Sequence, residues 1–182
     1  VSEGDPKFLE YIMVNGGYPY MDAVSNHPYI RPDKVDKRYD GMLSWMEQII
    51  TKYGGWKEQI ITEVGWPTHS GGISQEQAAI ELVKQAAAAD YYDIEINQYY
   101  CNSDSVTNYS SSHAEDNFGI FYNTYGEFKP SAYTISAFAS ETVGAIFCGK
   151  ILFEDKDIQC YSYLRDNELS CIIWSKSGNK SI

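Results

Sequence analysis

Long apolar runs and basic charge are both scarce in this sequence of 182 residues. No stretch approaches the roughly 20 consecutive apolar residues that a membrane-spanning helix requires. Lysine and arginine together number 14 against 25 acidic residues, and the resulting net charge of −11 repels nucleic acid phosphates and anionic lipid surfaces. We therefore expect no nucleic acid partner and no membrane partner, a soluble chain that is secreted or cytoplasmic, and a neutral ligand.

Cysteine and histidine are also few, with four and three residues. The cysteines are widely spaced, form no Cys-x-x-Cys pair and have no histidine pattern beside them, which argues against a zinc site or another metal site. Four cysteines are enough for two disulfides in a secreted protein, but a chain of this size does not need them. We expect all four to be small buried residues in strands: Cys101, Cys148, Cys160 and Cys171.

Tyrosine, in contrast, is abundant. The sequence contains 16 tyrosines and 4 tryptophans, and aromatic residues make up 15% of it. Tyrosine combines a flat apolar face with a hydroxyl group, which suits ligands such as sugars. Strands favour tyrosine as well, so most individual tyrosines are expected to be structural.

The first 142 residues alternate between helical and strand patterns. Apolar residues recur at spacings of three and four from Tyr39 to Tyr53, which is typical of an amphipathic helix. Ser74 and Gln77 form a capping-box pattern at the start of another helix. The expected order is a helix from Asp5, a strand at 21–26, a helix at 39–53, a strand at 59–62, a helix from Ser74, a strand at 94–100 and a helix from Lys129.

After Thr142 the pattern changes to short strands. Segments 145–153, 158–164 and 169–174 are separated by acidic turn residues, which is typical of an antiparallel meander. We expect an α/β domain at residues 1–142 and a small antiparallel β region at residues 143–182. The alternating helices and strands of the first domain predict a parallel sheet, either in a barrel or in a doubly wound sheet.

Polar and aromatic side chains follow three successive strands of the predicted parallel sheet. Barrels place their active sites at the carboxyl ends of their strands, so this placement favours a barrel. The sharpest segment is IITEVGWPT at residues 60–68, in which Glu63 follows a buried strand and a Gly-Trp-Pro turn sets an indole beside it. Such a carboxylate suits attack on the anomeric carbon of a sugar, although a plain surface glutamate has the same local pattern.

These segments resemble parts of clan A glycoside hydrolases, the retaining (β/α)8 barrels. ITEVGWPT is similar to their seventh strand, which bears the nucleophile, and MDAVSNHPY at residues 21–29 is similar to their sixth. Residues 115–120 and 129–133 resemble the connection from the eighth strand to the eighth helix, and the final meander resembles the β-sandwich that often follows the barrel. The resemblance implies an α/β fold: a partial TIM barrel of about strands 6 to 8 with their helices, followed by a small antiparallel β region.

The resemblance also implies roles for individual residues. By position, Glu63 matches the catalytic nucleophile. Substrate-binding roles are implied for His27, Tyr29, Trp66, Tyr99 and Tyr100, and the family commonly has tryptophan where this chain has Tyr99 or Tyr100. Because clan A chemistry uses side chains alone, a carbohydrate substrate but no cofactor and no metal is expected.

One part of the clan A pattern has no match in this sequence. The acid/base of these enzymes is the Glu of an Asn-Glu pair on the fourth strand, whereas Asn167-Glu168 falls in the C-terminal meander and is expected to form a turn. A complete barrel needs about 250 residues and about 140 precede the meander here. The sequence therefore predicts a fragment of a retaining glycoside hydrolase that cleaves β-linked glycosides or polysaccharides, with little turnover by itself, whose missing N-terminal half-barrel belongs to the same or another chain.

Two other interpretations stay open. A noncatalytic carbohydrate-binding or assembly module derived from such a barrel would keep Glu63 and the aromatic residues as a sugar-contact surface. An unrelated α/β domain would carry ITEVGWP by coincidence. The polar segment 102–116 is long for a connection, and we expect it at the rim of a cleft.

Overall fold

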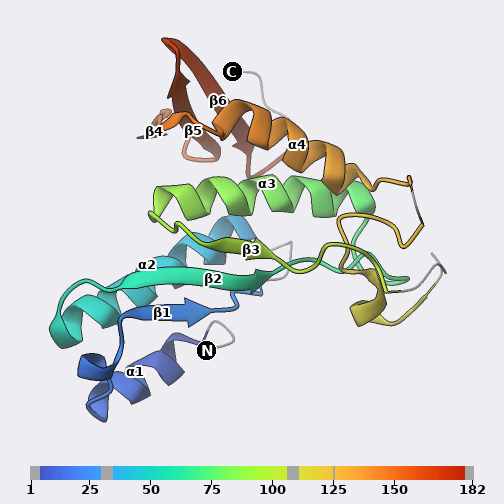
Figure 1. Cartoon of the computed structure of the whole chain (residues 1–182). Coiled ribbons are helices and arrows are strands. Elements are labelled where there is room, and N and C mark those ends of the chain that lie inside the picture. Colours follow the sequence, from blue (N-terminus) through green and yellow to red (C-terminus); the bar gives the residue numbers. More distant parts are fainter. Residues whose placement is uncertain (1–4, 30–34, 106–110, 125, 179–182) are drawn as a thin grey trace. The chain divides into compact units, whose positions relative to one another are not determined.

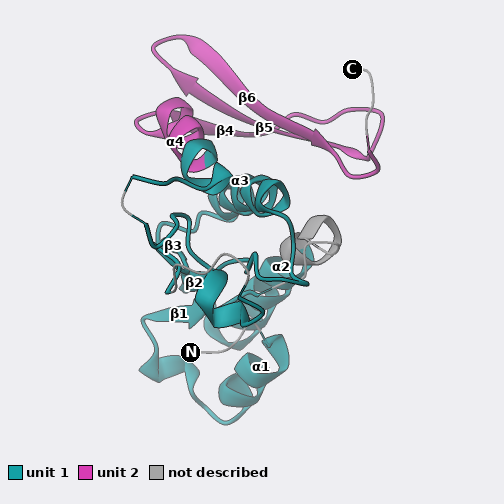
Figure 2. Cartoon of the chain, turned by 90° about the vertical axis from the view of Figure 1, so that its right-hand side faces the viewer, with its two compact units in different colours: residues 1–134 teal, residues 135–182 magenta. Residues whose placement is uncertain are grey.

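The computed structural model describes residues 5–29, 35–105, 111–124 and 126–178, with side chains from residue 41 onward in the second of these ranges. The chain divides into two compact units, residues 1–134 and 135–182 (Figure 2). The helix Pro130–Thr142 crosses this division. The domain boundary expected between residues 142 and 143 stays a prediction. Within the described residues, no helix combines the length and apolar character needed to cross a membrane.

Helices and strands alternate in the first unit in the order that the sequence predicts (Figure 1). Short 3-10 helices, η1 and η3, precede the first strand and follow the third. The elements are α1 (Pro6–Val14), η1 (Tyr18–Tyr20), β1 (Ala23–Asn26), α2 (Val35–Gly54), β2 (Glu58–Val64), α3 (Gln75–Tyr91), β3 (Asn97–Tyr99) and η3 (Ala114–Asn117), and α4 (Pro130–Thr142) begins in this unit.

Two of the predicted helix starts are confirmed by their caps. The Asp5 side chain accepts a hydrogen bond from the backbone N–H of Lys7 at 2.9 Å, and Pro6 occupies the first helical position of α1. At α3, Ser74 Oγ accepts from the backbone N–H of Gln77 at 3.0 Å. These bonds satisfy amide groups that have no partner inside the first helical turn.

The three strands of the first unit form a parallel sheet in the order β1-β2-β3, as the alternating pattern predicts. Val24 of β1 lies in a core cluster with Leu9 and Met13 of α1, while Ile61 of β2 packs in a second cluster with Leu43 of α2. Among the described residues β1 and β3 each pair with β2 alone, so both outer strands have an edge without a sheet partner.

The second unit confirms the predicted antiparallel meander. It contains β4 (Ile146–Lys150), β5 (Ile158–Arg165) and β6 (Glu168–Ser175), paired in the order β4-β5-β6. Asp166 and Asn167 connect β5 to β6 with φ angles of 52° and 66°, so the Asn-Glu pair at 167–168 lies at a turn, as expected. Asn and Asp adopt this left-handed conformation more readily than most residues.

The expectation that all four cysteines are buried in strands was wrong. Cys160 on β5 is buried, but Cys148 and Cys171 are exposed, and the half-buried Cys101 lies just after β3. The reason is the two-residue period of a strand, which sends alternate side chains to opposite faces of a sheet. A strand residue is therefore buried only if its own face is covered.

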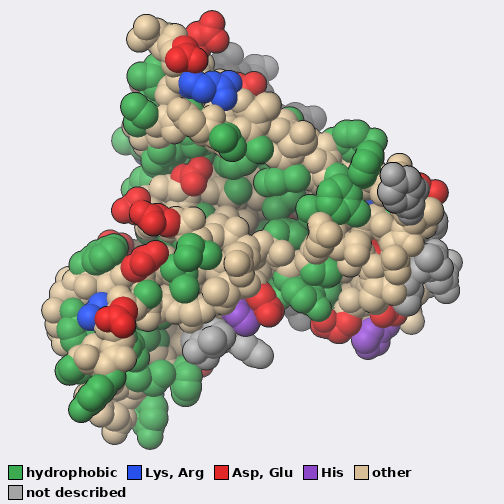
Figure 3. Space-filling view, viewed as in Figure 1, with side chains coloured by type: hydrophobic (Ala, Val, Ile, Leu, Met, Phe, Trp, Pro, Cys, Tyr) green, Lys and Arg blue, Asp and Glu red, His purple; other side chains and the backbone are tan. Residues whose placement is uncertain are grey.

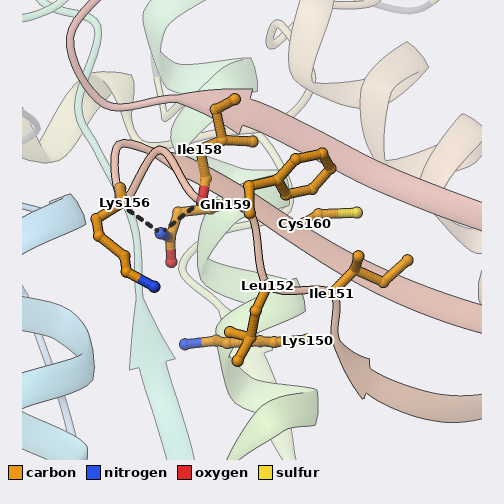
Figure 4. A pocket seen from close by; sticks show the side chains of 8 residues that line it. Lys150, Ile151, Leu152, Lys156, Ile158, Gln159 and Cys160 are labelled. Carbon is orange, nitrogen blue, oxygen red and sulfur yellow. Dashed lines mark hydrogen bonds between the residues drawn. The ribbon is translucent and has the colours of Figure 1, made fainter. Parts of the chain in front are cut away.

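A small cavity in the second unit has a mixed lining (Figure 4). Ile151, Leu152 and Phe153 supply apolar side chains to it, and Lys150 supplies a cation. Gln159 Nε2 donates to the backbone carbonyl oxygens of residues 156 and 158 at 3.4 and 3.0 Å. The amide nitrogen of this glutamine is thus engaged inside the unit, and every residue that lines the cavity belongs to this unit.

Candidate active site

The Glu63 carboxylate lies near the carboxyl end of β2, where β1 delivers polar partners to it. The Tyr29 hydroxyl donates to Glu63 Oε2 at 3.0 Å, and His27 Nδ1 lies 3.5 Å from the same oxygen. On its other side, the His27 ring places Nε2 3.0 Å from Thr62 Oγ1, which lies 2.8 Å from Ser25 Oγ. These contacts hold the carboxylate in place, and because the Glu63 side chain is 42% exposed, it is still accessible to a ligand.

In the space-filling view of Figure 3, which has the orientation of Figure 1, a histidine side chain lies beside an acidic side chain near the ends of the parallel strands. Parallel strands bring their carboxyl ends to the same edge of a sheet, and therefore residues 35 positions apart in sequence meet here.

An irregularity in β2 decides where Glu63 points. Ile61 pairs with Asn97 and Val64 pairs with Tyr99, so β2 advances three residues while β3 advances two. Such a bulge adds one residue to a strand and changes the direction of the following side chains. Ile61 and Val64 both lie in the core, while Thr62 and Glu63 between them both reach side chains of the segment that follows β1. In a regular strand these two neighbours would point to opposite faces.

Tyr29 is suited to be a permanent hydrogen-bond donor. Burial, and then its hydrogen bond to the Glu63 carboxylate, hold the pKa of the Tyr29 phenol well above its ordinary value. A raised phenol pKa means that the hydroxyl keeps its proton through neutral and moderately alkaline pH. Tyr29 therefore continues to donate a hydrogen bond to Glu63 throughout this pH range.

Two residues that the sequence analysis did not single out complete the surroundings of Glu63. The Phe118 ring packs edge-on against Tyr29 and Tyr100, with ring centroids 6.0 and 5.3 Å away. The Tyr100 hydroxyl is 3.5 Å from Glu115 Oε2, which brings a second carboxylate of this chain to the same group of aromatic rings. Both residues belong to the EDNFGI segment at 115–120, which resembles the connection from the eighth strand to the eighth helix of clan A barrels. That resemblance assigned no role to them.

Trp66 and Tyr99 have different surroundings from the other predicted site residues. Trp66 is only 2% exposed and lies in the core cluster of β2, α2 and α3, with the Tyr99 ring packed against it at a centroid distance of 6.4 Å. Burial raises the pKa of Tyr99 to about 12, although a hydrogen bond with the Trp66 backbone opposes this shift. The structure thus gathers His27, Tyr29, Glu63 and Tyr100 at one place, with Trp66 and Tyr99 packed behind them.

In the part of the chain that the structure describes, His, Cys, Asp and Glu side chains do not gather in the groups of three or more that hold a metal. The polar site consists of a carboxylate, an imidazole and phenols, which are groups that act by nucleophilic attack and hydrogen bonding.

The class of fold follows from these observations together with a structural likeness. A parallel α/β unit with polar strand ends, followed by an antiparallel sheet, superposes on part of a family 39 glycoside hydrolase from the gut symbiont Bacteroides cellulosilyticus WH2. The TM-score is 0.72 at 18% sequence identity, and the match covers 95% of this chain and 38% of that one. The chain therefore has the fold of a segment of a glycoside hydrolase and spans about two fifths of that enzyme's length.

A second solved structure gives a weaker likeness. It is a β-glucuronidase of Bifidobacterium dentium complexed with coumarin-3-O-glucuronide, with a TM-score of 0.44, 18% identity, and coverage of 68% of this chain and 21% of that one. A likeness at that TM-score adds nothing to the assignment of the fold. No protein-family model and no curated protein matches the sequence.

Proposed function

We propose that this chain is the nucleophile-bearing segment of a retaining β-glycoside hydrolase and that Glu63 is its nucleophile. The observation that carries the proposal is the exposed Glu63 carboxylate at the ends of parallel strands, held by Tyr29 at 3.0 Å and by His27 at 3.5 Å. The parallel unit is proposed to be part of a (β/α)8 barrel, about strands 6 to 8, since catalytic groups in barrels lie at this end of the strands.

In this proposal the Glu63 carboxylate attacks the anomeric carbon and forms a covalent glycosyl ester while the leaving oxygen departs. Tyr29 orients the carboxylate before attack, because its proton is retained and its hydroxyl points at Oε2. His27 and Tyr100 flank the same carboxylate and are proposed to contact the sugar. Hydroxyl and imidazole groups suit a neutral, hydroxyl-rich ring, and the net charge of −11 disfavours an anionic substrate.

Retaining hydrolysis also requires an acid/base carboxyl roughly 5 to 5.5 Å from the nucleophile. We propose that it comes from an N-terminal half-barrel outside these 182 residues, in the same or another polypeptide. Two facts support this source: β1 and β3 each have an edge without a sheet partner among the described residues, and the chain covers 38% of the family 39 structure. A strand of the missing half would satisfy the unpaired backbone groups along β1.

The test uses substrates that do not need an acid. A 2,4-dinitrophenyl β-glycoside has a leaving group that departs without protonation, so the nucleophile alone is enough for the first step. A panel of such glycosides is expected to yield one glycosyl group on the peptide that contains Glu63, detected by mass spectrometry, together with one equivalent of dinitrophenolate. Glu63→Gln should form no adduct, while the control Glu58→Gln at the other end of β2 should react as the unmodified chain does.

The same experiment separates the two main functions. A chain that binds glycosides in the panel without forming an adduct would contradict the nucleophile proposal and support the carbohydrate-binding module. A label on a different carboxylate, with Glu63→Gln still reactive, would also overturn the assignment. Mixing the chain with an N-terminal half-barrel and a nitrophenyl glycoside then tests turnover, which should appear only in the mixture and only with Glu63 intact.

Removing one hydroxyl tests the role of Tyr29. Tyr29→Phe is expected to slow adduct formation by about 10- to 100-fold, since a hydrogen bond to a charged group contributes about 1.5–3 kcal/mol. The measurement is the rate of dinitrophenolate release at saturating glycoside. Tyr20→Phe, at a side chain that is 90% exposed, is the matched control and should leave this rate unchanged. Equal rates in both variants would remove Tyr29 from the mechanism.

A further inference from the structure

A buried ion pair lies beside the proposed site without belonging to it. Lys129 is fully buried and Asp104 is 4% exposed, and Lys129 Nζ donates to Asp104 Oδ1 at 2.6 Å. Burial lowers the pKa of the Lys129 ammonium, and the Asp104 carboxylate opposes that shift. Buried ion pairs contribute little net stability compared with apolar residues of the same size, so a pair in this position calls for a reason other than stability.

The ammonium group connects segments that are far apart in the sequence. Besides Asp104, Lys129 Nζ donates to Thr68 Oγ1 at 3.2 Å and to the backbone carbonyl of Asn117 at 3.5 Å. Thr68 follows β2, Asp104 follows β3, and Lys129 directly precedes α4. One buried charge thus ties together the loops that leave the carboxyl ends of two neighbouring strands.

Both chain neighbours of Phe118 are held by this ion pair. The Asn117 carbonyl accepts from Lys129 Nζ and also from the Thr68 backbone N–H, the latter at 3.0 Å. The Gly119 N–H donates to Asp104 Oδ1 at 2.9 Å. A methyl group on Gly119 would lie only 2.1 Å from the Asp104 backbone nitrogen, so the two segments are in direct backbone contact. Phe118 therefore has little freedom to shift along or across its segment.

The fixed ring in turn contacts the groups around Glu63. Phe118 is 8% exposed and packs edge-on against both Tyr29 and Tyr100. Tyr29 is the residue whose hydroxyl donates to the Glu63 carboxylate. Hydrogen bonds thus connect the ion pair to both chain neighbours of Phe118, and the packed rings of Phe118 and Tyr29 continue this connection to the Glu63 carboxylate.

We infer that the buried Lys129–Asp104 pair is a positioning device: it fixes Phe118 against Tyr29 and Tyr100 and so sets the orientation of Glu63 for attack on a sugar. The inference rests on the proposed function for its last step and on the contacts of this chain for the others. Lys129 and Asp104 are positioning residues, since neither touches the Glu63 carboxylate directly. A misplacement of about 1 Å in such an arrangement can cost about 100-fold in rate.

The test removes the charges without leaving one of them unpaired. Lys129→Met combined with Asp104→Asn keeps the volume of the cluster and an acceptor for Gly119, but removes the ammonium that holds Asn117 and Thr68. The matched control is Lys84→Met with Glu81→Gln, which neutralises a second ion pair whose side chains are 12% and 1% exposed, on helix α3. Both double variants lose a shielded ion pair, and only the first loses the link to Phe118.

Two measurements are made on the full chain. Nuclear Overhauser effects between the Phe118 ring and the rings of Tyr29 and Tyr100 report the positioning directly and require no activity. The maximal rate of adduct formation with the reactive dinitrophenyl glycoside reports its consequence. We expect the Lys129/Asp104 variant to lose the ring contacts and to react about 10- to 100-fold more slowly, and the Lys84/Glu81 variant to keep both.

Unchanged ring contacts in a folded Lys129/Asp104 variant would overturn the inference, as would an equal loss of rate in the control. If that double variant fails to fold, Asp104→Asn alone retains the ammonium with its Thr68 and Asn117 acceptors. It should weaken the ring contacts, because the Gly119 N–H then donates to a neutral amide oxygen in place of a carboxylate. If no glycoside labels the unmodified chain, the proposed function fails, and the ring contacts still decide whether the ion pair positions Phe118.

Discussion

Gly65→Ala is expected to lower the free energy of unfolding by about 3 kcal/mol, because a side chain at this position has no room. Its methyl group would lie 2.1 Å from the backbone carbonyl oxygen of Tyr100 and 3.2 Å from the Phe118 ring. The backbone after β2 must move away from the backbone after β3, which separates Glu63 from Tyr100. For a domain of this size the loss corresponds to a drop of about 6–12 °C in the midpoint of thermal unfolding, measurable by circular dichroism.

Gly41→Ala is the matched control for this prediction. Gly41 lies in helix α2 and is exposed, and apart from the backbone of its own helix its methyl group would have no described atom within 4 Å. Alanine is favoured over glycine inside a helix by about 0.5–1 kcal/mol, so this variant should be slightly more stable than the unmodified chain. The two glycine-to-alanine changes are thus expected to shift the free energy of unfolding in opposite directions. Similar shifts from both would contradict the close approach of backbones at Gly65.

Trp66→Ala is expected to lower the free energy of unfolding by about 3–5 kcal/mol, the usual cost of removing a large aromatic side chain from a core. Trp66 is 2% exposed and packs with Ile61, Val64 and Leu43. Urea unfolding followed by circular dichroism would measure the loss, and Trp66→Phe should recover much of it because the smaller ring still fills part of the space.

Trp56→Ala provides the comparison, because the Trp56 side chain is 70% exposed. Its effect on the free energy of unfolding should stay within about 0.5 kcal/mol, as for most surface substitutions. A small effect of Trp66→Ala, together with weaker glycoside binding, would show instead that the indole is available to a ligand. That outcome would return Trp66 to the substrate-binding role that its place in the IITEVGWPT segment implies.

Much of the fold was accessible from local patterns. The helix starts at Asp5 and Ser74 were correct because a capping side chain acts within three residues of chain. The strands β1, β2 and β3 were predicted in the right order, since buried strands carry compact apolar runs between turn residues. The meander was predicted correctly for the same reason. The burial of the cysteines was not, because no local pattern tells which face of that sheet is covered.

The candidate site was accessible only in part. Glu63 lies near the end of a strand, while His27, Tyr29 and Tyr100 follow strands, and parallel pairing brings such residues together whatever the details of the packing. Phe118 and Glu115 were not singled out, because they belong to a polar segment whose distance from the strand ends depends on how a long connection folds back. Nor does any feature near Lys129 and Asp104, which are 25 positions apart, mark them as a buried pair.

The amino-acid sequence by itself determined the alternation of helices and strands, the parallel sheet, the antiparallel meander and the residues that follow each strand, because periodicity, caps and turn residues act over a few positions. Only the tertiary structure decided which of those residues meet. The bulge between Ile61 and Val64 turns Glu63 toward Tyr29 and His27, and packing among three elements buries Trp66. Both outcomes depend on the register and packing of neighbouring elements, which are set by contacts between segments distant in the chain.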